Sequence, residues 1–403
     1  MLCIERGANG VSLLEKRAGI VEGMTPRMAE IVTYYDSLVP SRESEKLMDL
    51  AGLRGLRRAA LEKKAGLVGG YIFEIMDDLL SHARDEQALP KGATMVSIGM
   101  DRVNVPYEEP NPEGEKSERT QRLRQKKPYQ RAVPDPIVRA FRGDFIGSVS
   151  FYDRHGEKIA GYSYGLSHTE APQRLADWLV ADVVAALQQQ PNLSISVCQD
   201  GARELWPTTW EALNARTELD DVMVHACIDF HHFIPRVHKA VDALWGEDEC
   251  SSWEQRILNE SNAVLALEDA ILEELCWRSE EEFYSEAMEP VHNFLTYIEE
   301  RTRVDGREDR RSELFDYAHF RELGLPIGSG ATEATCKNLA NVRMKRSGDR
   351  WGVAGAKATL TCRGLALSTG RWEIVWPYFA KHYVCEVVPL QIATSIAESD
   401  LAA

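Results

Sequence analysis

Three acidic residues in separate segments could together hold divalent metal ions. Asp101 lies within a strand-like run, Asp200 directly follows another, and Glu333 stands near the start of an expected helix after the turn 325–330. Phosphodiester cleavage needs a deprotonated nucleophile and a stabilised leaving oxygen, and two Mg2+ ions about 3.5–4 Å apart supply both. These carboxylates predict such a site, in which Asp101 bridges both ions while Asp200 and Glu333 each complete one shell.

Each of these acids also has an ordinary structural explanation. An acid at the end of a strand commonly forms a turn or caps a helix, and Glu333 near a helix N-terminus suits the helix dipole. Asp229 and His232 carry the same ambiguity. Asp229 is an expected helix N-cap, yet the pair, one helical turn apart, could instead support the carboxylate cluster or touch DNA. No further Cys or His lies at zinc spacing beside them.

The distribution of charge bears on a nucleic-acid partner. The chain has 403 residues and a formal net charge of -16, which as a global average argues against DNA binding. Residues 251–320 carry an excess of 11 acids, whereas 116–142 and 331–380 carry excesses of 7 and 5 bases. Because salt screens charges beyond about 10 Å, phosphate groups respond to local basic surfaces. The two basic stretches therefore keep a DNA partner open.

Two sets of basic residues are candidates for contact with DNA. The first follows Glu333 on the late helix and could reach phosphates, although a solvated helix face explains the same residues. Trp351 beside this set offers either a stacking surface for a base or a buried anchor. The second set lies in short N-terminal helices that resemble a helix-turn-helix module or any three-helix bundle. The first set is Lys337, Arg343, Lys345, Arg346 and Arg350, and the second is Arg54, Arg57 and Arg58.

Composition excludes several other classes of protein. No apolar run approaches the roughly 18 residues needed to span a bilayer, so no membrane partner is expected. The N-terminal residues lack the pattern of a secretory signal. The eight cysteines are scattered without a CxxC pair, which predicts reduced thiols in a cytoplasmic protein and no zinc finger.

The spacing of apolar residues divides the chain into helical and strand-rich parts. Thr25-Pro26 predicts a helix start, and Ser41 is expected to cap the next helix. From residue 93 the period changes to that of strands, and Pro106 is expected to end the first of them. The expected strands are 94–105, 145–152, 158–166, 193–199 and 222–228, with helices at 172–190 and 206–214.

This order of three strands, helix, strand, helix and strand matches that of an RNase H-like core. The predicted fold class is α/β, a mixed sheet with helices that is preceded by a helical domain and interrupted by a helical insertion. The expected units are a helical N-terminal domain at 1–90, a first core part at 91–232 with a polar loop at 108–136, the insertion at 233–322, a second core part at 323–385 and a tail at 386–403.

In four of its stretches the chain resembles bacterial insertion-sequence transposases of the DDE type. The resemblance covers roughly residues 25–385 and implies divalent metal at Asp101, Asp200 and Glu333. It also suggests that Asp229 and His232 match a DxxH-like element that follows the last core strand in related transposases. The stretches are VSIGMDRVNVP at 96–106, QDGA at 199–202, DFHH at 229–232, and LPIGSGATEATCK at 325–337 with RMKRSGDRW at 343–351.

The resemblance implies a metal-dependent polynucleotidyl transferase. It would cut and join DNA strands at insertion-sequence ends with two Mg2+ ions, for which Mn2+ could substitute. The implied partners are double-stranded DNA, both element ends and target, and further copies of the chain on that DNA in the bacterial cytoplasm. The alternative is a domesticated, catalytically inactive DNA-binding descendant, although the three intact acids favour the enzyme. A small-molecule hydrolase lacks support, because no HExxH or GxxxxGK[ST] motif occurs. The one GxSxG match, GYSYG at 161–165, lies inside the expected strand 158–166 and not at a turn from a strand into a helix.

Overall fold

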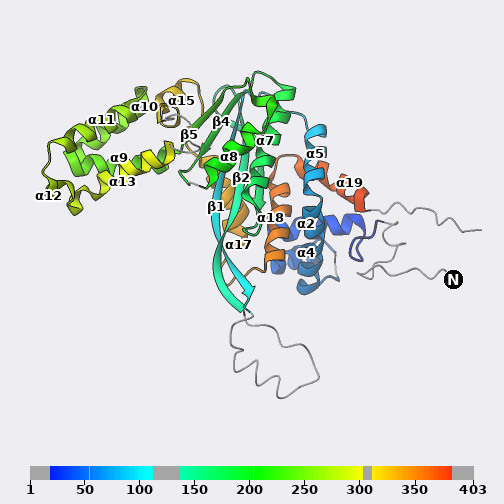
Figure 1. Ribbon diagram of the computed structural model, residues 1–403. Helices are drawn as coiled ribbons and strands as arrows, with labels where there is room; N and C mark the ends of the chain where they lie inside the picture. Colours follow the sequence, from blue (N-terminus) through cyan, green and yellow to red (C-terminus); the bar gives the residue numbers. More distant parts are fainter. Residues whose placement is uncertain (1–18, 54, 112–136, 203, 303–310, 384–403) are drawn as a thin grey trace, which may run out of the picture.

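The computed structural model describes residues 19–53, 55–111, 137–202, 204–302 and 311–383. A five-stranded mixed sheet lies at the centre in the order β3-β2-β1-β4-β5, with helices around it (Figure 1). The first three strands are antiparallel, whereas β4 and β5 run parallel to β1. The strands are β1 Met95–Pro110, β2 Ile137–Tyr152, β3 Lys158–Leu166, β4 Ser194–Gln199 and β5 Val224–Ile228.

The predicted end of the first strand at Pro106 is wrong. Pro106 lies inside β1 opposite Phe141, and its carbonyl accepts a hydrogen bond from the backbone of Trp351 at 3.1 Å. Because β4 pairs with β1 only as far as Ile98, this part of β1 has an outer edge that tolerates a residue without an N–H group. The expected loop at 108–136 is therefore too long, since β1 continues through Pro110; residues 112–136 lie outside the described ranges.

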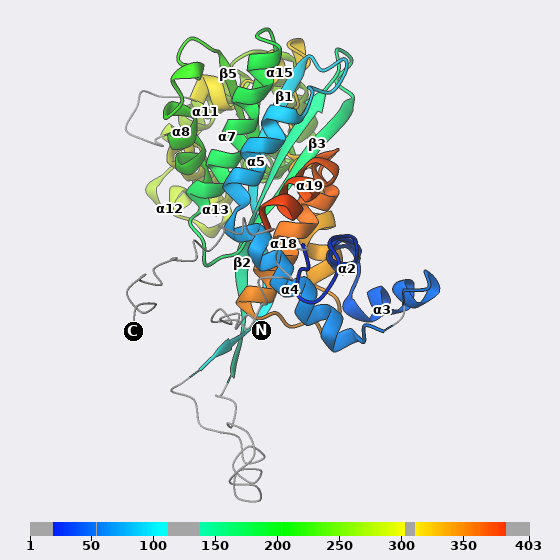
Figure 2. The ribbon, with the colours of Figure 1, turned by 90° about the vertical axis from the view of Figure 1, so that its right-hand side faces the viewer.

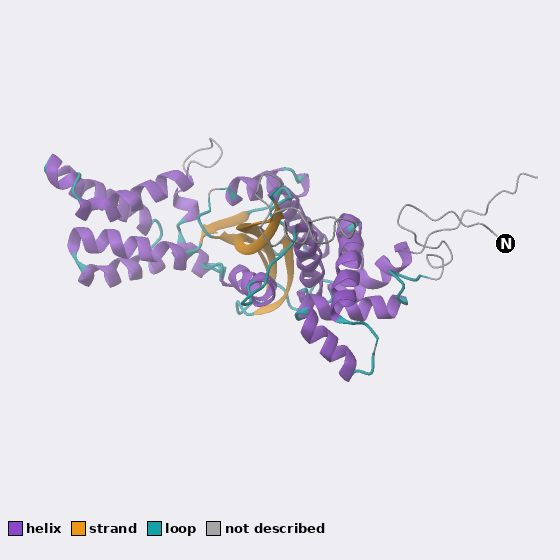
Figure 3. Cartoon of the chain, turned by 90° about the horizontal axis from the view of Figure 1, so that it is seen from below, coloured by secondary structure: helices purple, strands orange, loops and turns teal. Residues whose placement is uncertain are grey.

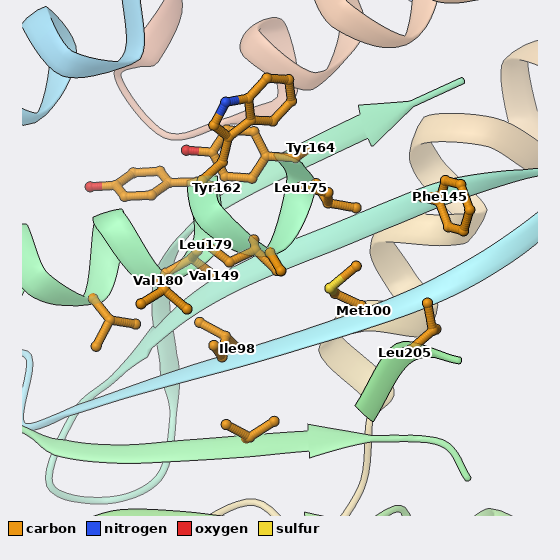
Figure 4. Packing of buried hydrophobic residues seen from close by; sticks show 14 of the residues in the cluster. Ile98, Met100, Phe145, Val149, Tyr162, Tyr164, Leu175, Leu179, Val180 and Leu205 are labelled. Atoms are coloured by element: carbon orange, nitrogen blue, oxygen red, sulfur yellow. The ribbon is translucent and has the colours of Figure 1, made fainter. Parts of the chain in front are cut away.

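One face of the sheet is covered by two connecting helices. Helix α7, Pro172–Gln189, joins β3 to β4, and α8, Leu205–Asn214, joins β4 to β5, which confirms the predicted order of elements. Apolar side chains spaced along α7 pack onto the strands, where the absence of a side chain at Gly147 makes room for Leu175 and Leu179. Figure 4 shows this packing, with Ile98, Met100 and Val149 of the sheet beneath Leu175, Leu179 and Val180 of α7.

The N-terminal helices pack against C-terminal ones (Figure 2). The predicted start at Thr25-Pro26 is confirmed, because the Thr25 hydroxyl accepts from the backbone of Met28 at 3.3 Å. The predicted cap at Ser41 is wrong, since Ser41 is already the first helical residue. The helices concerned are α2 Pro26–Leu38, α4 Arg58–Glu74 and α5 Met76–Glu86, which meet α18 Val353–Leu367 and α19 Arg371–Tyr383. Helix α3, Ser41–Leu50, packs instead on α2 and α4.

A buried ionic network ties these outer helices to the sheet. Asp182 of α7 accepts hydrogen bonds from Arg84 of α5 at 2.8 Å and from Arg371 of α19 at 2.9 Å. The hydroxyl of Tyr164 on β3 donates to the same carboxylate. Burial acts to raise the pKa of Asp182, but the two guanidinium groups hold it below its ordinary value. The charged carboxylate thus joins three helices and one strand.

The described part of the predicted insertion is helical. Its helices extend to one side of the sheet (Figures 1 and 3), and α12 lies at their far end in Figure 1. None of the helices in the described ranges is long and apolar enough to cross a membrane. The helices are α9 Phe230–Trp245, α10 Cys250–Asn259, α11 Ala263–Cys276, α12 Glu280–Phe283, α13 Glu289–Thr302, α14 Arg311–Leu314 and α15 Tyr317–Glu322.

The opposite face of the sheet bears the helix that contains Glu333. This helix, α16 Gly330–Cys336, continues through a π-helical segment, η4 Lys337–Asn341, into α17 Val342–Met344. A Cβ atom at Gly99 would lie less than 3.0 Å from both the Thr332 hydroxyl and the carbonyl oxygen of Cys198. The Thr332 hydroxyl also lies 2.8 Å from that of Ser148 on β2. Helix α16 therefore rests directly on the backbone of the sheet.

We expect Gly99→Ala to destabilise the fold by about 1–3 kcal/mol, because the new methyl group must displace α16 or the strand. Gly66→Ala is the matched control: Gly66 lies within α4 and no neighbouring atom lies within 4 Å of an added Cβ atom. That change should be neutral or stabilise by about 0.4–1 kcal/mol. Urea unfolding of both variants measures the difference, and equal midpoints would show that α16 does not need the glycine.

Candidate active site

The strand registers bring three acidic residues to neighbouring positions. Strand β1 pairs with β4 as far as Ile98↔Val197, and β4 pairs with β5 as far as Gln199↔Ile228. Continued past these last pairs, the registers align one acid from each strand end. The residues aligned in this way are Asp101, Asp200 and Asp229.

Strand alternation places Asp101 on the face of the sheet that carries α16, and, continued one residue past β4 and β5, it assigns Asp200 and Asp229 to the same face. Side chains two positions apart along a strand share a face, so each acid shares the face of the residue two positions earlier. One of these, Gly99, lies under Thr332 of α16, and the sulfur of Cys227 lies 3.7 Å from the carbonyl oxygen of Pro326, just before that helix. The residues two positions before the acids are Gly99, Cys198 and Cys227.

An open hollow of about 670 Å³ brings Asp101 and Glu333 together. Asp101 is half-buried in its wall: one carboxylate oxygen accepts from the backbone of Arg102 at 2.6 Å, and the other lies 3.3 Å from the sulfur of Cys336. Glu333 is exposed in the first turn of α16. Two lysines also line the hollow, so carboxylates and cations share one surface. The lining residues are Asp101, Arg102, Val103, Asn104, Gly330, Glu333, Ala334, Cys336, Lys337, Asn341 and Lys345.

Asp229 forms a buried junction between two helices. One of its oxygens accepts from the backbone of His231 and His232, which confirms the predicted N-cap of α9. Its other oxygen accepts from the backbone and the hydroxyl of Ser329, the N-cap of α16. Burial acts to raise the pKa of Asp229, but these hydrogen bonds hold it below its ordinary value. Four donors already engage the carboxylate, so its role is structural.

His232 links this junction to Glu333. Its Nδ1 atom lies 3.3 Å from Asp229, and its Nε2 atom lies 3.6 Å from a carboxylate oxygen of Glu333. Within the described ranges these three residues are the one group of three potential metal-binding side chains whose ligand atoms all lie within 4.8 Å of one another. Because the Asp229 oxygens are engaged, we interpret the group as a chain that orients Glu333.

Of the three predicted metal ligands, only Asp101 and Glu333 share the hollow. Asp200 does not line the hollow; one of its oxygens accepts from the backbone of Ala202 at 2.5 Å, and its carbonyl accepts from the Trp206 indole at 2.9 Å. It thus forms a turn, as the ordinary explanation expects. A two-ion site does not need a tight trio, since ions about 4 Å apart with ligands at about 2.1 Å can join oxygens about 8 Å apart.

The structure corrects the first set of DNA-binding candidates. Arg343 is only 4% exposed, and its guanidinium donates to the carbonyl of Asp36 at 3.1 and 3.2 Å, so it cannot reach a phosphate. Arg346 is exposed but pairs with Glu43 at 2.5 Å. Arg350 is exposed and donates to the carbonyl of Asp349. Lys337 and Lys345 are exposed in the hollow itself and remain the best placed of the set.

Trp351 proves to be an anchor. Its backbone pairs with that of β1 at Pro106 and Glu108, and its indole donates to the carbonyl of Met344 at 3.0 Å. The buried Arg343 guanidinium lies 4.9 Å from the ring centroid. These contacts fix the chain after α17 against the outer edge of β1, so the ring is not free to stack on a base.

The described members of the second basic set lie on the surface. Arg57 and Arg58 are exposed at the start of α4, and Arg57 lies 3.5 Å from Glu45. Arg54 lies outside the described residues. Contact of this set with DNA stays a prediction.

Sequence reasoning missed Cys336 and Ser329. Cys336 stands three positions after Glu333, a spacing that puts both on one side of a helix, and this signal could have placed the thiol in the site. Ser329 was an expected turn residue, but its bond to Asp229 joins positions 100 residues apart, for which no local signal exists.

We expect the Cys336 thiol to react slowly with alkylating reagents and the exposed Cys276 to react fast. Burial and the neighbouring Asp101 charge raise the pKa of Cys336, which leaves little reactive thiolate. Asp101→Asn removes that charge and should speed the modification of Cys336 without affecting Cys276. Peptide mapping over a time course measures both rates, and an unchanged Cys336 rate would argue against the contact between the sulfur and Asp101.

Comparison of the chain with protein-family models gave no match, and comparison with curated proteins and with solved structures gave none either. The interpretation of the site therefore depends on its own residues, their geometry and the sequence motifs in which they lie.

Proposed function

We propose that this chain is a DDE transposase that cuts and joins DNA at the ends of an insertion sequence. The observation that carries the proposal is the hollow in which Asp101 of β1 and Glu333 of α16, distant in the sequence, meet beside Lys337 and Lys345. The element order β1, β2, β3, α7, β4, α8, β5 further supports an RNase H-like core. The substrate would be double-stranded DNA in the bacterial cytoplasm, bound by more than one copy of the chain.

The residues of the hollow fit divalent metal. Carboxylate oxygens are the ligands that Mg2+ prefers, and an open hollow leaves room for the waters that this ion retains. Asp101, Glu333 and the aligned Asp200 would hold two Mg2+ or Mn2+ ions. The chemistry supplied by such a bound pair is activation of the nucleophile and stabilisation of the leaving 3′-oxygen.

The remaining residues prepare the site for DNA. Asp229 lies 3.3 Å from His232 Nδ1, and His232 Nε2 lies 3.6 Å from the Glu333 carboxylate, so the imidazole ring is placed beside the proposed ligand. Lys337 and Lys345 provide positive charge within the same hollow, where a phosphate group would lie between carboxylates and cations. The arrangement suits a DNA backbone that enters from solvent.

A DNA-binding descendant without activity is the second candidate. The observation in its favour is that both Asp101 oxygens have neighbours, Arg102 and Cys336, and that Glu333 turns toward His232. The enzyme remains our proposal, because Glu333 is exposed and the bonds to Asp101 come from one backbone amide and one weakly donating thiol.

We expect Asp101→Asn, Asp200→Asn and Glu333→Gln each to abolish Mg2+-dependent cleavage and to leave DNA affinity within a few-fold. The amide keeps the shape of the side chain but removes the charge that would hold the ions. The assay incubates the protein with its flanking genomic DNA and maps nicks at 3′ ends. Glu280→Gln, at the far end of the insertion, is the matched control and should cut normally. Near-normal cutting by any of the three variants would remove that residue from the site.

Neutralising Lys337 and Lys345 should weaken binding to all DNA sequences and flatten its salt dependence. Each lost phosphate contact should reduce the slope of log affinity against log salt by about 0.9. Lys91→Gln is the control, because Lys91 is exposed in the turn before β1, and about 20 Å of strand lies between the start of β1 and Asp101. Fluorescence anisotropy across a salt series gives the slopes, and an unchanged slope for the double variant would show that DNA does not cross the hollow.

A further inference from the structure

The turn that carries Asp200 is held by the helical insertion. Arg301, near the end of α13, donates from Nε to the carbonyl of Gly201 at 3.0 Å. The Arg301 guanidinium lies 3.6 Å from the ring centroid of Tyr297, one turn earlier on the same helix. Arg236 of α9 lies over the same ring at 4.4 Å. Side chains from two helices of the insertion therefore converge next to Asp200.

The side chains of Tyr297 and Arg301 on α13 occupy the space that a side chain at Gly201 would enter. A Cβ atom at Gly201 would lie less than 3.0 Å from the Tyr297 hydroxyl and from Arg301 Nε. On the other side of the turn, the Trp206 indole of α8 donates to the carbonyl of Asp200 at 2.9 Å. The turn is thus fixed by two elements, one of the core and one of the insertion.

The sheet itself does not fix this turn. The pairing between β4 and β5 ends at Gln199↔Ile228, so Asp200 lies one residue beyond the paired strand. The contacts with Trp206, Tyr297 and Arg301 therefore hold the turn beyond the end of the strand.

We propose that Arg301 is a positioning residue for Asp200, so that the helical insertion forms part of the frame of the metal site. The catalytic meaning of this role rests on the proposed function. Partners that lie one bond behind a metal ligand commonly change metal affinity or activity about 10–100-fold when removed. Arg301 acts one residue further back, because its bond is to the backbone carbonyl of Gly201, directly after Asp200, and it packs against the Tyr297 ring beside the same turn.

The test compares Arg301→Ala with Arg301→Lys and with Arg236→Ala, which removes the second cation over the Tyr297 ring. The half-saturating Mn2+ concentration for DNA cleavage is measured separately from the maximal rate. We expect about a tenfold increase for Arg301→Ala, a smaller one for Arg301→Lys, and a change within about twofold for Arg236→Ala. A general loss of packing would instead lower thermal stability and maximal rate in all three variants.

A second variant addresses the same contact from the turn. Gly201→Ala should push the turn away from Tyr297 and raise the half-saturating Mn2+ concentration as Arg301→Ala does. A normal Mn2+ response in both variants, with both proteins folded, would overturn the positioning role.

Hydrogen exchange separates this inference from the proposed function. The Ala202 amide donates to the Asp200 carboxylate, so Arg301→Ala should speed exchange in a peptide that covers residues 199–205. This readout needs neither metal nor DNA. A wild-type chain that cuts no DNA would overturn the proposed function. Faster exchange in Arg301→Ala would still support the inference that Arg301 stabilises the turn. Unchanged exchange at Ala202 would count against Arg301 even if the wild-type chain cuts DNA.

Discussion

The contact of α16 with the bare backbone at Gly99 is the constraint on which the site depends. Thr332 reaches the strand only because position 99 lacks a side chain, and Cys336, one helical turn later, then reaches Asp101. Glu333 lies between these two contacts and is carried to the hollow by them. A side chain at position 99 would push α16 away from the strand, and the distance between Asp101 and Glu333 would increase. The geometry of the two acids is thus set by a residue that has no functional group.

Two further junctions fix the acids from outside the sheet. Asp229 accepts hydrogen bonds from four donors at the N-termini of α9 and α16. The first helix of the insertion and the helix that carries Glu333 therefore start at the same buried carboxylate. Later in the insertion, the last turn of α13 reaches the turn after Asp200. The insertion is therefore joined to the proposed site at two places, while its part around α12 extends away from the sheet. Such a helical unit can stiffen the site without supplying a ligand to it.

Local patterns predicted the elements well and the side-chain partners poorly. The period of apolar residues gave α7 within one residue of its end, because a helix buried on one side must repeat its contacts every turn. Pro106 was misjudged because a strand with an outer edge tolerates proline. Arg343 was misjudged because a basic stretch does not reveal that the carbonyl of Asp36, far along the chain, accepts its guanidinium. The shared hollow of Asp101 and Glu333 followed from their motifs, whereas the turn of Glu333 toward His232 depends on a side-chain rotation that no pattern encodes.

The π-helical segment after α16 has a consequence for how this region tolerates changes in length. The hollow is lined by Glu333, Lys337, Asn341 and Lys345, each four positions after the last. In a regular α-helix each such step overshoots a full turn by about 40°, so the fourth residue would have rotated well away from the first. The wider turns of η4 absorb this drift and keep acid and bases on one line. With one residue fewer in 337–341, Lys345 would follow Glu333 by eleven positions, and eleven steps of about 100° in a regular α-helix also end about 20° from the direction of Glu333. This stretch can therefore lose one residue and still keep acid and base on one line.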